Sequence, residues 1–202
     1  MSKNFEDALK IRKPDHKINP LFIKRWSSRS MTGEAIDPEI FSSLLEAARW
    51  APSSSNEQES RFIYASRNSP HWETFFSLLA EGNKPWCKFA SHLVVIVSKT
   101  QFTKSGSANP VHEFDAGAAF ENLVLEAADR NLVAHGMAGF DFQKAKVSLK
   151  VPDNFAVNAM IAIGVYDPTE KNLDEKTKGR EVPSMRKPLS EVSSEGVFNF
   201  AG

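Results

Sequence analysis

One long helix-like stretch between two apolar strands constrains this fold more than any other feature. Residues 92–99, HLVVIVSK, and 158–166, NAMIAIGVY, are continuous apolar runs, which are typical of strands buried on both faces. Between them, residues 112–132, HEFDAGAAFENLVLEAADRNL, carry apolar side chains around most of a helix surface. Such a helix has to be enclosed on nearly every side, by a core or by a subunit interface. Strands separated by helices predict an α/β or α+β fold.

Further elements are predicted before this core. The stretch DPEIFSSLLEAARWA (37–51) predicts a helix, because Asp37 can accept hydrogen bonds from first-turn amides and Pro38 suits the first helical position. The β-branched and aromatic run RFIYAS (61–66) predicts a strand. After it, HWETFFSLLAEG (71–82) predicts a helix, because its large apolar residues share one face.

Length and composition indicate one domain. At 202 residues the chain is near the upper end of ordinary single domains, and we expect a single domain over residues 1–202. Residues 167–188 are polar and punctuated by proline, which predicts an extended surface segment. The expected domain therefore carries an extended C-terminal segment over about residues 168–202.

The charge balance and cysteine count narrow the function classes. Lys and Arg together number 25, as do Asp and Glu, so no global charge favours nucleic acid or anionic lipid as a partner. The single cysteine, Cys87, excludes an intrachain disulfide framework and fits a reducing compartment. The N-terminal residues contain no apolar core of a signal peptide. We therefore expect a cytoplasmic protein with a small-molecule partner, and no metal site, because the 5 histidines are scattered.

A cationic pattern lies in KRWSSRS, residues 24–30. In an extended backbone, Arg25, Ser27 and Arg29 project to one side, while Trp26 and Ser28 project to the other. Guanidinium groups match phosphate oxygens, and a serine hydroxyl can add a hydrogen bond. A solvated strand edge explains the same residues and is the more common case for this pattern in isolation. The Trp26 indole could shape a ligand pocket or belong to the core.

Three other polar stretches are candidate ligand sites. APSSSNEQ (51–58) follows the first predicted helix, and its donors and acceptors could form hydrogen bonds with the edge of a polar heteroaromatic ring. The alternative is an ordinary hydrophilic connecting loop. GMAGFD (136–141) has glycines that allow close backbone approach to a flat ligand, or that simply form a turn. SMRKPLSEV (184–192) offers Arg186 for a phosphate, or as ordinary surface charge.

The order and spacing of these four stretches resemble the nitroreductase family of flavoproteins. The family patterns R-x-S-x-R and A-P-S-S-x-N-x-Q are matched at residues 25–29 and 51–58, and the central helix, the following GMAGFD and the C-terminal arginine come in the family's order. The resemblance covers about residues 20–192. It implies an α+β fold with a central mixed or antiparallel sheet flanked by helices, and a homodimer with FMN at the interface.

The resemblance also implies a function and a set of ligand contacts. It implies an FMN-dependent oxidoreductase that moves hydride by a ping-pong cycle from NADH or NADPH to a nitroaromatic or quinone-like acceptor. The FMN carries the chemistry, so no catalytic side chain is expected. Position by position, the implied FMN contacts are Arg25, Trp26, Ser27, Arg29, Pro52, Ser53, Ser54, Asn56, Gln58, Ala138, Gly139 and Arg186. The arginines and Ser27 would bind the phosphate and one ring edge, residues 52–58 would line the flavin from the partner subunit, and the amides at 138–139 would approach its reactive nitrogen.

Two departures from the family pattern keep alternatives open. Glu59 and Ser60 follow Gln58 where family members usually have proline and often tryptophan, and Ala138 stands where many have glutamate. The missing carboxylate permits an FMN-binding carrier or sensor without turnover. Relatives on the same scaffold also include flavin-fragmenting and dehalogenating enzymes, which leaves a different reaction open.

Overall fold

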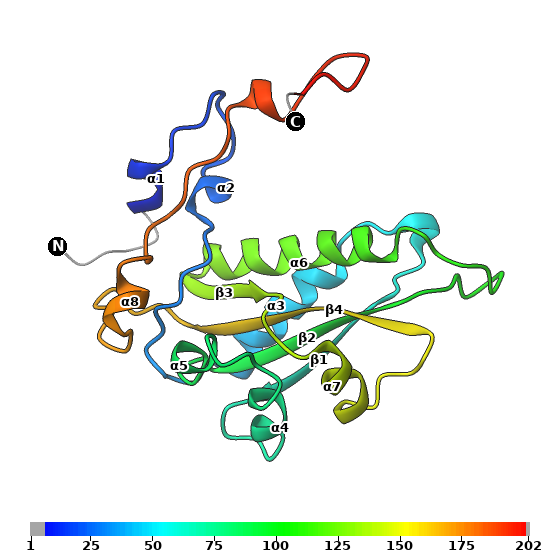
Figure 1. Ribbon diagram of the computed structural model, residues 1–202, viewed down its shortest axis with the longest axis horizontal. Coiled ribbons are helices and arrows are strands. Elements are labelled where there is room, and N and C mark those ends of the chain that lie inside the picture. Colours follow the sequence, from blue (N-terminus) through cyan, green and yellow to red (C-terminus); the bar gives the residue numbers. More distant parts are fainter. Residues whose placement is uncertain (1–6, 201–202) are drawn as a thin grey trace.

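The fold is a four-stranded antiparallel sheet with helices on both faces (Figure 1). The computed structural model describes residues 7–200. The strand order is β1-β2-β4-β3, and every neighbouring pair is antiparallel. The strands are β1 (Ser60–Ser66), β2 (His92–Lys99), β3 (Leu132–Met137) and β4 (Phe155–Val165). The predicted α+β class and the apolar strands at 92–99 and 158–166 are confirmed.

One face of the sheet is covered by α3 (Pro38–Arg49) and α6 (His112–Asp129), which pack against each other and against the same strands. The start of α3 is as predicted, because the Asp37 side chain accepts from the amide of Glu39 at 2.8 Å. Val94 and Ile96 of β2 point to this face, whereas Leu93 and Val95 point to the other. This alternation gives the molecule one apolar core on each side of the sheet.

The opposite face is covered by α4 (Trp72–Phe76), α5 (Lys84–Cys87) and α7 (Phe142–Ser148). The helix predicted over residues 71–82 is therefore too long, since α4 ends at Phe76. The reason is a competing pairing: the amide of Ala80 donates to Gly139 at 3.0 Å, and the amide of Asp141 donates to Leu78 at 2.9 Å. These bonds use backbone groups that a longer helix would need.

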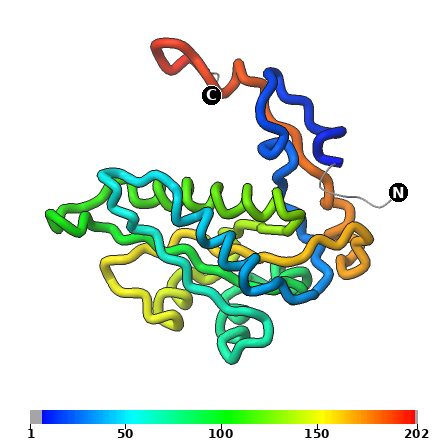
Figure 2. The backbone as a smooth tube through the Cα atoms, turned by 180° about the vertical axis from the view of Figure 1, so that it is seen from behind, coloured from blue at the N-terminus to red at the C-terminus, as the bar shows by residue number. Residues whose placement is uncertain are grey.

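An arm leaves the sheet at one end of the molecule (Figures 1 and 2). It consists of residues 7–24, with α1 (Asp7–Ile11) and α2 (Pro20–Lys24), and of residues 182–200, which run beside them and include the 3₁₀ turn η2 (Leu189–Glu191). Nine large apolar side chains of the arm are exposed: Ile11, Ile18, Phe22, Val182, Met185, Leu189, Val192, Val197 and Phe198.

The segment before the arm differs from the prediction. Residues 167–188 were expected to lie extended on the surface, but they contain the short helix α8 (Glu175–Lys178) and several buried side chains. Asp167 is 2% exposed and Glu181 is completely buried. Both contact residues 28–30, so the polar composition of residues 167–188 reflects a buried hydrogen-bond network as well as an exposed surface. Within residues 7–200, no helix combines the length and the apolar character that crossing a membrane requires.

Candidate functional site

The cationic strip, residues 25–30, follows α2 as extended backbone. Asn19 caps α2 and Pro20 starts it, and the helix gives way to extended backbone at Arg25, which has φ −65° and ψ 120°. From there burial alternates. Residues 25, 27 and 29 are half-buried, and residues 26, 28 and 30 are buried. The predicted alternation is confirmed, so Arg25, Ser27 and Arg29 share one side of the strip.

Glu181 holds the buried side of the strip, and no sequence pattern indicated this role. Its carboxylate accepts hydrogen bonds from the Ser28 hydroxyl, from the Arg29 amide at 2.9 Å and from the Ser30 amide at 3.3 Å. Burial raises the pKa of Glu181, while these donors and the Arg29 guanidinium oppose the rise. Its position in a polar segment more than 150 residues away gave no signal of this contact.

Trp26 lies on the buried side of the strip. Its indole is 6% exposed and meets the Tyr166 ring edge-on, with the ring centroids 6.5 Å apart. The side chain therefore packs in the core, and only the backbone of Trp26 adjoins the side occupied by Arg25 and Ser27. Its predicted contact with a ligand stays a prediction.

Arg29 sits over an aromatic and imidazole pair. Its guanidinium carbon lies 5.9 Å from the Trp86 ring centroid, and the Trp86 ring lies 4.7 Å from that of His135. The Nδ1 of His135 donates to the Ser28 carbonyl at 3.0 Å. Burial lowers the pKa of His135 to about 4, so this imidazole is neutral near pH 7. Burial and the nearby Arg180 lower the pKa of Arg29.

Three arginines form a cluster where the arm meets the sheet: Arg12, Arg25 and Arg186. Arg12 donates to the carbonyls of Ser184 at 3.0 Å and Arg25 at 2.7 Å, which ties both halves of the arm together. Its pKa falls to about 10, because the side chain is buried and because Arg186 and Arg25 are close. The anion recorded near Arg25 is Glu121, whose Oε1 is 3.6 Å from Nε. The cluster therefore holds more positive charge than its carboxylate neighbour neutralises.

The turn after β3 carries Ala138 and Gly139, and both are exposed. No acceptor within residues 7–200 pairs with their backbone amides. Packing within the chain requires glycine at position 139, because a Cβ there would lie 2.6 Å from the side-chain nitrogen of Asn83. A Cβ on Gly136 would likewise lie 2.8 Å from the Phe120 ring. Gly136 and Gly139 therefore make room for protein side chains, and the amides of Ala138 and Gly139 have no acceptor among residues 7–200.

The strip adjoins the strand that leads to this turn. His135 of β3 contacts Ser28 of the strip. Ala138 lies three residues further along the same chain, which corresponds to ~10 Å of extended backbone. The strip is thus joined to the arginine cluster through Arg25 and to the turn through β3. We call the strip, the arginine cluster and the turn together the cationic half-site.

The polar loop, residues 52–58, lies elsewhere. It includes the 3₁₀ turn η1 (Ser54–Asn56), and Ser55, Asn56 and Gln58 all have positive φ, between 53° and 55°. Such conformations are uncommon for residues other than glycine and cluster at functional sites. The loop is held from inside: the Ser54 amide donates to Asp115 of α6 at 2.8 Å, and the Gln58 amide donates to the Ser53 hydroxyl at 3.0 Å.

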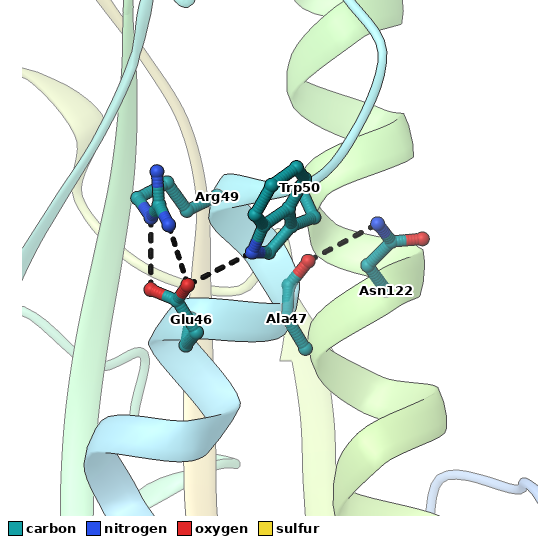
Figure 3. A network of polar contacts seen from close by, with 5 residues as sticks. All are labelled: Glu46, Ala47, Arg49, Trp50 and Asn122. Atoms are coloured by element: carbon teal, nitrogen blue, oxygen red, sulfur yellow. Dashed lines mark hydrogen bonds and ion pairs between the residues drawn. The ribbon is translucent and has the colours of Figure 1, made fainter.

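A cavity of about 500 Å³ opens beside the loop. Pro52, Ser53 and Gln58 line it together with the last turns of α3. Those turns are held by a network of hydrogen bonds (Figure 3). The Glu46 carboxylate accepts from the Arg49 guanidinium and from the Trp50 indole, each at 2.8 Å. The Asn122 side chain of α6 donates to the Ala47 carbonyl at 3.1 Å. Trp50 is nevertheless 72% exposed, so the loop is flanked by a fixed and open aromatic ring.

The two halves of the predicted site do not meet within one chain. Arg25 contacts α6 at Glu121, whereas Ser54 contacts it at Asp115. Six residues of α-helix rotate the attachment point by ~240° and shift it by ~9 Å. The polar loop and the arm accordingly lie toward opposite ends of α6 (Figures 1 and 2). No hydrogen bond or ion pair recorded among residues 7–200 joins residues 52–58 to the cationic half-site.

Comparisons with known proteins agree with this fold. Residues 23–85 match the family model described as the nitroreductase family. A solved structure described as an oxidoreductase containing FMN is 39% identical, with 94% of this chain and 97% of that chain covered and a TM-score of 0.90. A structure described as a nitroreductase in complex with FMN, from Desulfovibrio desulfuricans, is 25% identical, with coverages of 91% and 100% and a TM-score of 0.69.

A curated relative matches over a shorter range. An uncharacterised 15.4 kDa protein of Mycolicibacterium smegmatis is 38% identical over 85 residues, which are 41% of this chain and 55% of that protein. The chain therefore spans about half the length of this curated relative.

Proposed function

Because the chain belongs to the nitroreductase family, we propose that it is an FMN-dependent oxidoreductase. It passes hydride from NADH or NADPH, by way of FMN, to an electron-poor acceptor such as a nitroaromatic or a quinone. The single observation that carries the FMN assignment is the arginine cluster beside an extended strip and two free amides. The reaction chemistry is supplied by the flavin when it is bound, and the chain's residues bind and orient it.

The arginine cluster fits a phosphate. Burial first, and then repulsion from Arg186 and Arg25, lowers the pKa of Arg12 to about 10. The donors of Arg12 are directed to backbone carbonyls, so Arg12 acts as a brace between the two halves of the arm. The Arg186 guanidinium donates from Nη1 to the Ser184 hydroxyl at 3.1 Å, and Arg25 lies 3.6 Å from Glu121. The other donors of these two arginines are assigned to the phosphate, and a phosphate dianion would relieve the repulsion within the cluster. Arg29 and Ser27, further along the strip, would reach the ring edge or the ribityl chain.

The turn at residues 138–139 fits the polar edge of the ring. Two exposed amides without acceptors can donate to a heteroaromatic nitrogen or oxygen. This contact uses backbone, so it does not need the glutamate that many relatives have at the position of Ala138. The side chains near this turn then orient the ring and leave one ring face open to the nicotinamide and the acceptor.

The site becomes complete in a homodimer. The polar loop and the cationic half-site are separated within one chain. Ser55, Asn56 and Gln58 of the loop have positive φ, a conformation that clusters at functional sites. A second copy would bring its polar loop to the cationic half-site of the first. The exposed stripe of α6 supports this assembly: Phe114 is 80% exposed, and the space beside Gly117 is open. The exposed apolar side chains of the arm would be covered in the same way.

The proposal is tested by the colour of the purified protein. The protein is purified without added cofactor, its visible spectrum is recorded, and NADH or NADPH is added without oxygen. A flavin spectrum that bleaches with either nucleotide and returns when a quinone is added supports the reductase. A yellow protein that neither nucleotide bleaches supports the binding module instead. A colourless protein that takes up no added FMN contradicts both.

A further inference from the structure

Glu59 is a buried carboxyl group beside the polar loop. It lies between Gln58 and the first residue of β1, and its side chain is 1% exposed. One carboxyl oxygen accepts from the Asn109 side chain at 3.3 Å, and the other is buried without a hydrogen-bond partner. A buried carboxylate with an unpaired oxygen is costly, whereas a protonated carboxyl can donate from that oxygen. The position is also one of the chain's departures from the family pattern.

Asp115 is the charged group next to it. Its side chain is 7% exposed and lies in the first turn of α6, where the helix dipole favours an anion. It accepts from the Ser54 amide at 2.8 Å. Burial, and after it the neighbouring Asp115, raise the pKa of Glu59. The proton of the pair therefore belongs on Glu59.

Other titratable groups on the adjoining elements are engaged elsewhere. Lys99 of β2 donates from Nζ to the Thr103 hydroxyl at 2.8 Å, and Arg61 of β1 donates to the Gln58 carbonyl at 2.7 Å. His112 of α6 contacts the Ser98 hydroxyl at 2.7 Å. None of these has a recorded contact with the Glu59 carboxyl within residues 7–200, so no cation compensates its ionisation.

We propose that Glu59 is a positioning residue of the flavin site: it remains protonated and shares its proton with Asp115, which fixes the Ser54 amide and with it the strained loop. This inference rests on the proposed function, because residues 52–58 would serve the flavin of the partner subunit. When pH rises and Glu59 loses its proton, two buried negative charges face each other, and the loop has to move. Flavin affinity is therefore expected to fall on the alkaline side.

The test compares the FMN dissociation constant between pH 5.5 and 9 in wild type and in Glu59→Gln. Glutamine keeps a donor and cannot ionise. We expect the wild-type constant to rise by about tenfold for each pH unit above the pKa of the pair, and the Glu59→Gln constant to stay at the low-pH wild-type value. Glu113→Gln, at an exposed carboxyl in the same helix turn, is the matched control and should follow wild type. A Glu59→Gln protein with the wild-type pH slope would overturn the proposal, and so would a wild type without a slope.

A second readout separates this inference from the proposed function. The unfolding temperature of the flavin-free protein is measured over the same pH range. Because the pKa of Glu59 is raised by folding, its stabilising contribution is complete at acid pH and is lost as pH rises. Glu59→Gln should therefore match wild type near pH 5.5 and unfold at a higher temperature at pH 9. Identical curves would reject the shared proton, whereas absence of FMN binding at every pH would reject the proposed function.

Discussion

In the proposed site, Arg25 and Arg29 face a phosphate and a ring edge, and other side chains hold the backbone between these two arginines. Ser28 and Ser30 are turned inward toward Glu181 and Asp167, which leaves the alternate residues facing outward. Glu181 accepts hydrogen bonds from two consecutive amides of the strip, those of Arg29 and Ser30. The geometry of the cationic side chains thus depends on an anion buried behind them.

Arg25→Ala should weaken FMN binding. Loss of one charge-assisted contact to a phosphate costs ~1.5 to 3 kcal/mol, which corresponds to a dissociation constant about 10 to 150 times higher. Fluorescence titration of flavin-free protein measures this directly. Arg130→Ala, which removes an arginine paired with Glu126 at the C-terminal end of α6, is the control and should bind as wild type. Equal affinity in Arg25→Ala would remove Arg25 from the site.

Glu181→Ala should destabilise the protein and loosen the strip. The change leaves the Ser28 hydroxyl and two backbone amides without their buried acceptor. Each group left unsatisfied is expected to lower the free energy of unfolding by ~1 to 3 kcal/mol. Urea denaturation measures the change, and Glu191→Ala in the exposed turn η2 is the control. If Glu181→Ala unfolds at the same urea concentration as Glu191→Ala, the carboxylate is not what holds the strip.

At the scale of elements, helix α6 contacts different parts of the molecule with its different faces. One of its faces packs on α3 and the sheet, a second face meets Arg25 through Glu121, and a third face remains open at Phe114 and Gly117. The sequence predicted a helix enclosed on nearly every side. Within one chain this enclosure is incomplete, and a second copy would complete it.

Phe114→Glu should therefore shift the protein toward monomer and lower its FMN content. A charge at the centre of an apolar interface is desolvated without a partner, which opposes association. Sedimentation measures the monomer fraction, and the flavin absorbance of the same sample gives the occupancy. Val147→Glu introduces the same charge at a side chain that is 77% exposed on α7, on the other face of the sheet. Both variants remaining dimeric would show that α6 is not the interface.

Local patterns predicted most elements correctly and long-range contacts poorly. The strands at 92–99 and 158–166 and the start of α3 were readable because continuous apolar runs and a cap are local signals. The end of α4 was not, because it depends on pairing with residues 139–141. Neither Arg12 nor Glu181 stood out in the sequence, since the importance of each comes from residues more than ten positions away.

At the scale of the whole molecule, the candidate site is split between two distant parts of one chain. The cationic half-site lies where the arm meets the sheet, and the polar loop lies toward the other end of α6 (Figure 1). The family resemblance assigns both to one flavin, and we propose that a second copy of the chain brings them together. The arm, with its nine exposed apolar side chains, is the part of the chain best suited to reach across.

The most direct test of this composite site is the FMN content of a mixed dimer. One chain carries Arg25→Ala with Arg29→Ala, and the other carries Ser54→Trp. The indole would fill the volume of the flavin, while the hydrogen bond from the backbone amide of residue 54 to Asp115 is kept. Each variant alone should form a folded, flavin-free homodimer. If the site is shared, the mixed dimer regains one intact site and binds one FMN. If each site lies within a single chain, both sites of the mixed dimer are damaged, and a dimer without FMN would contradict the account.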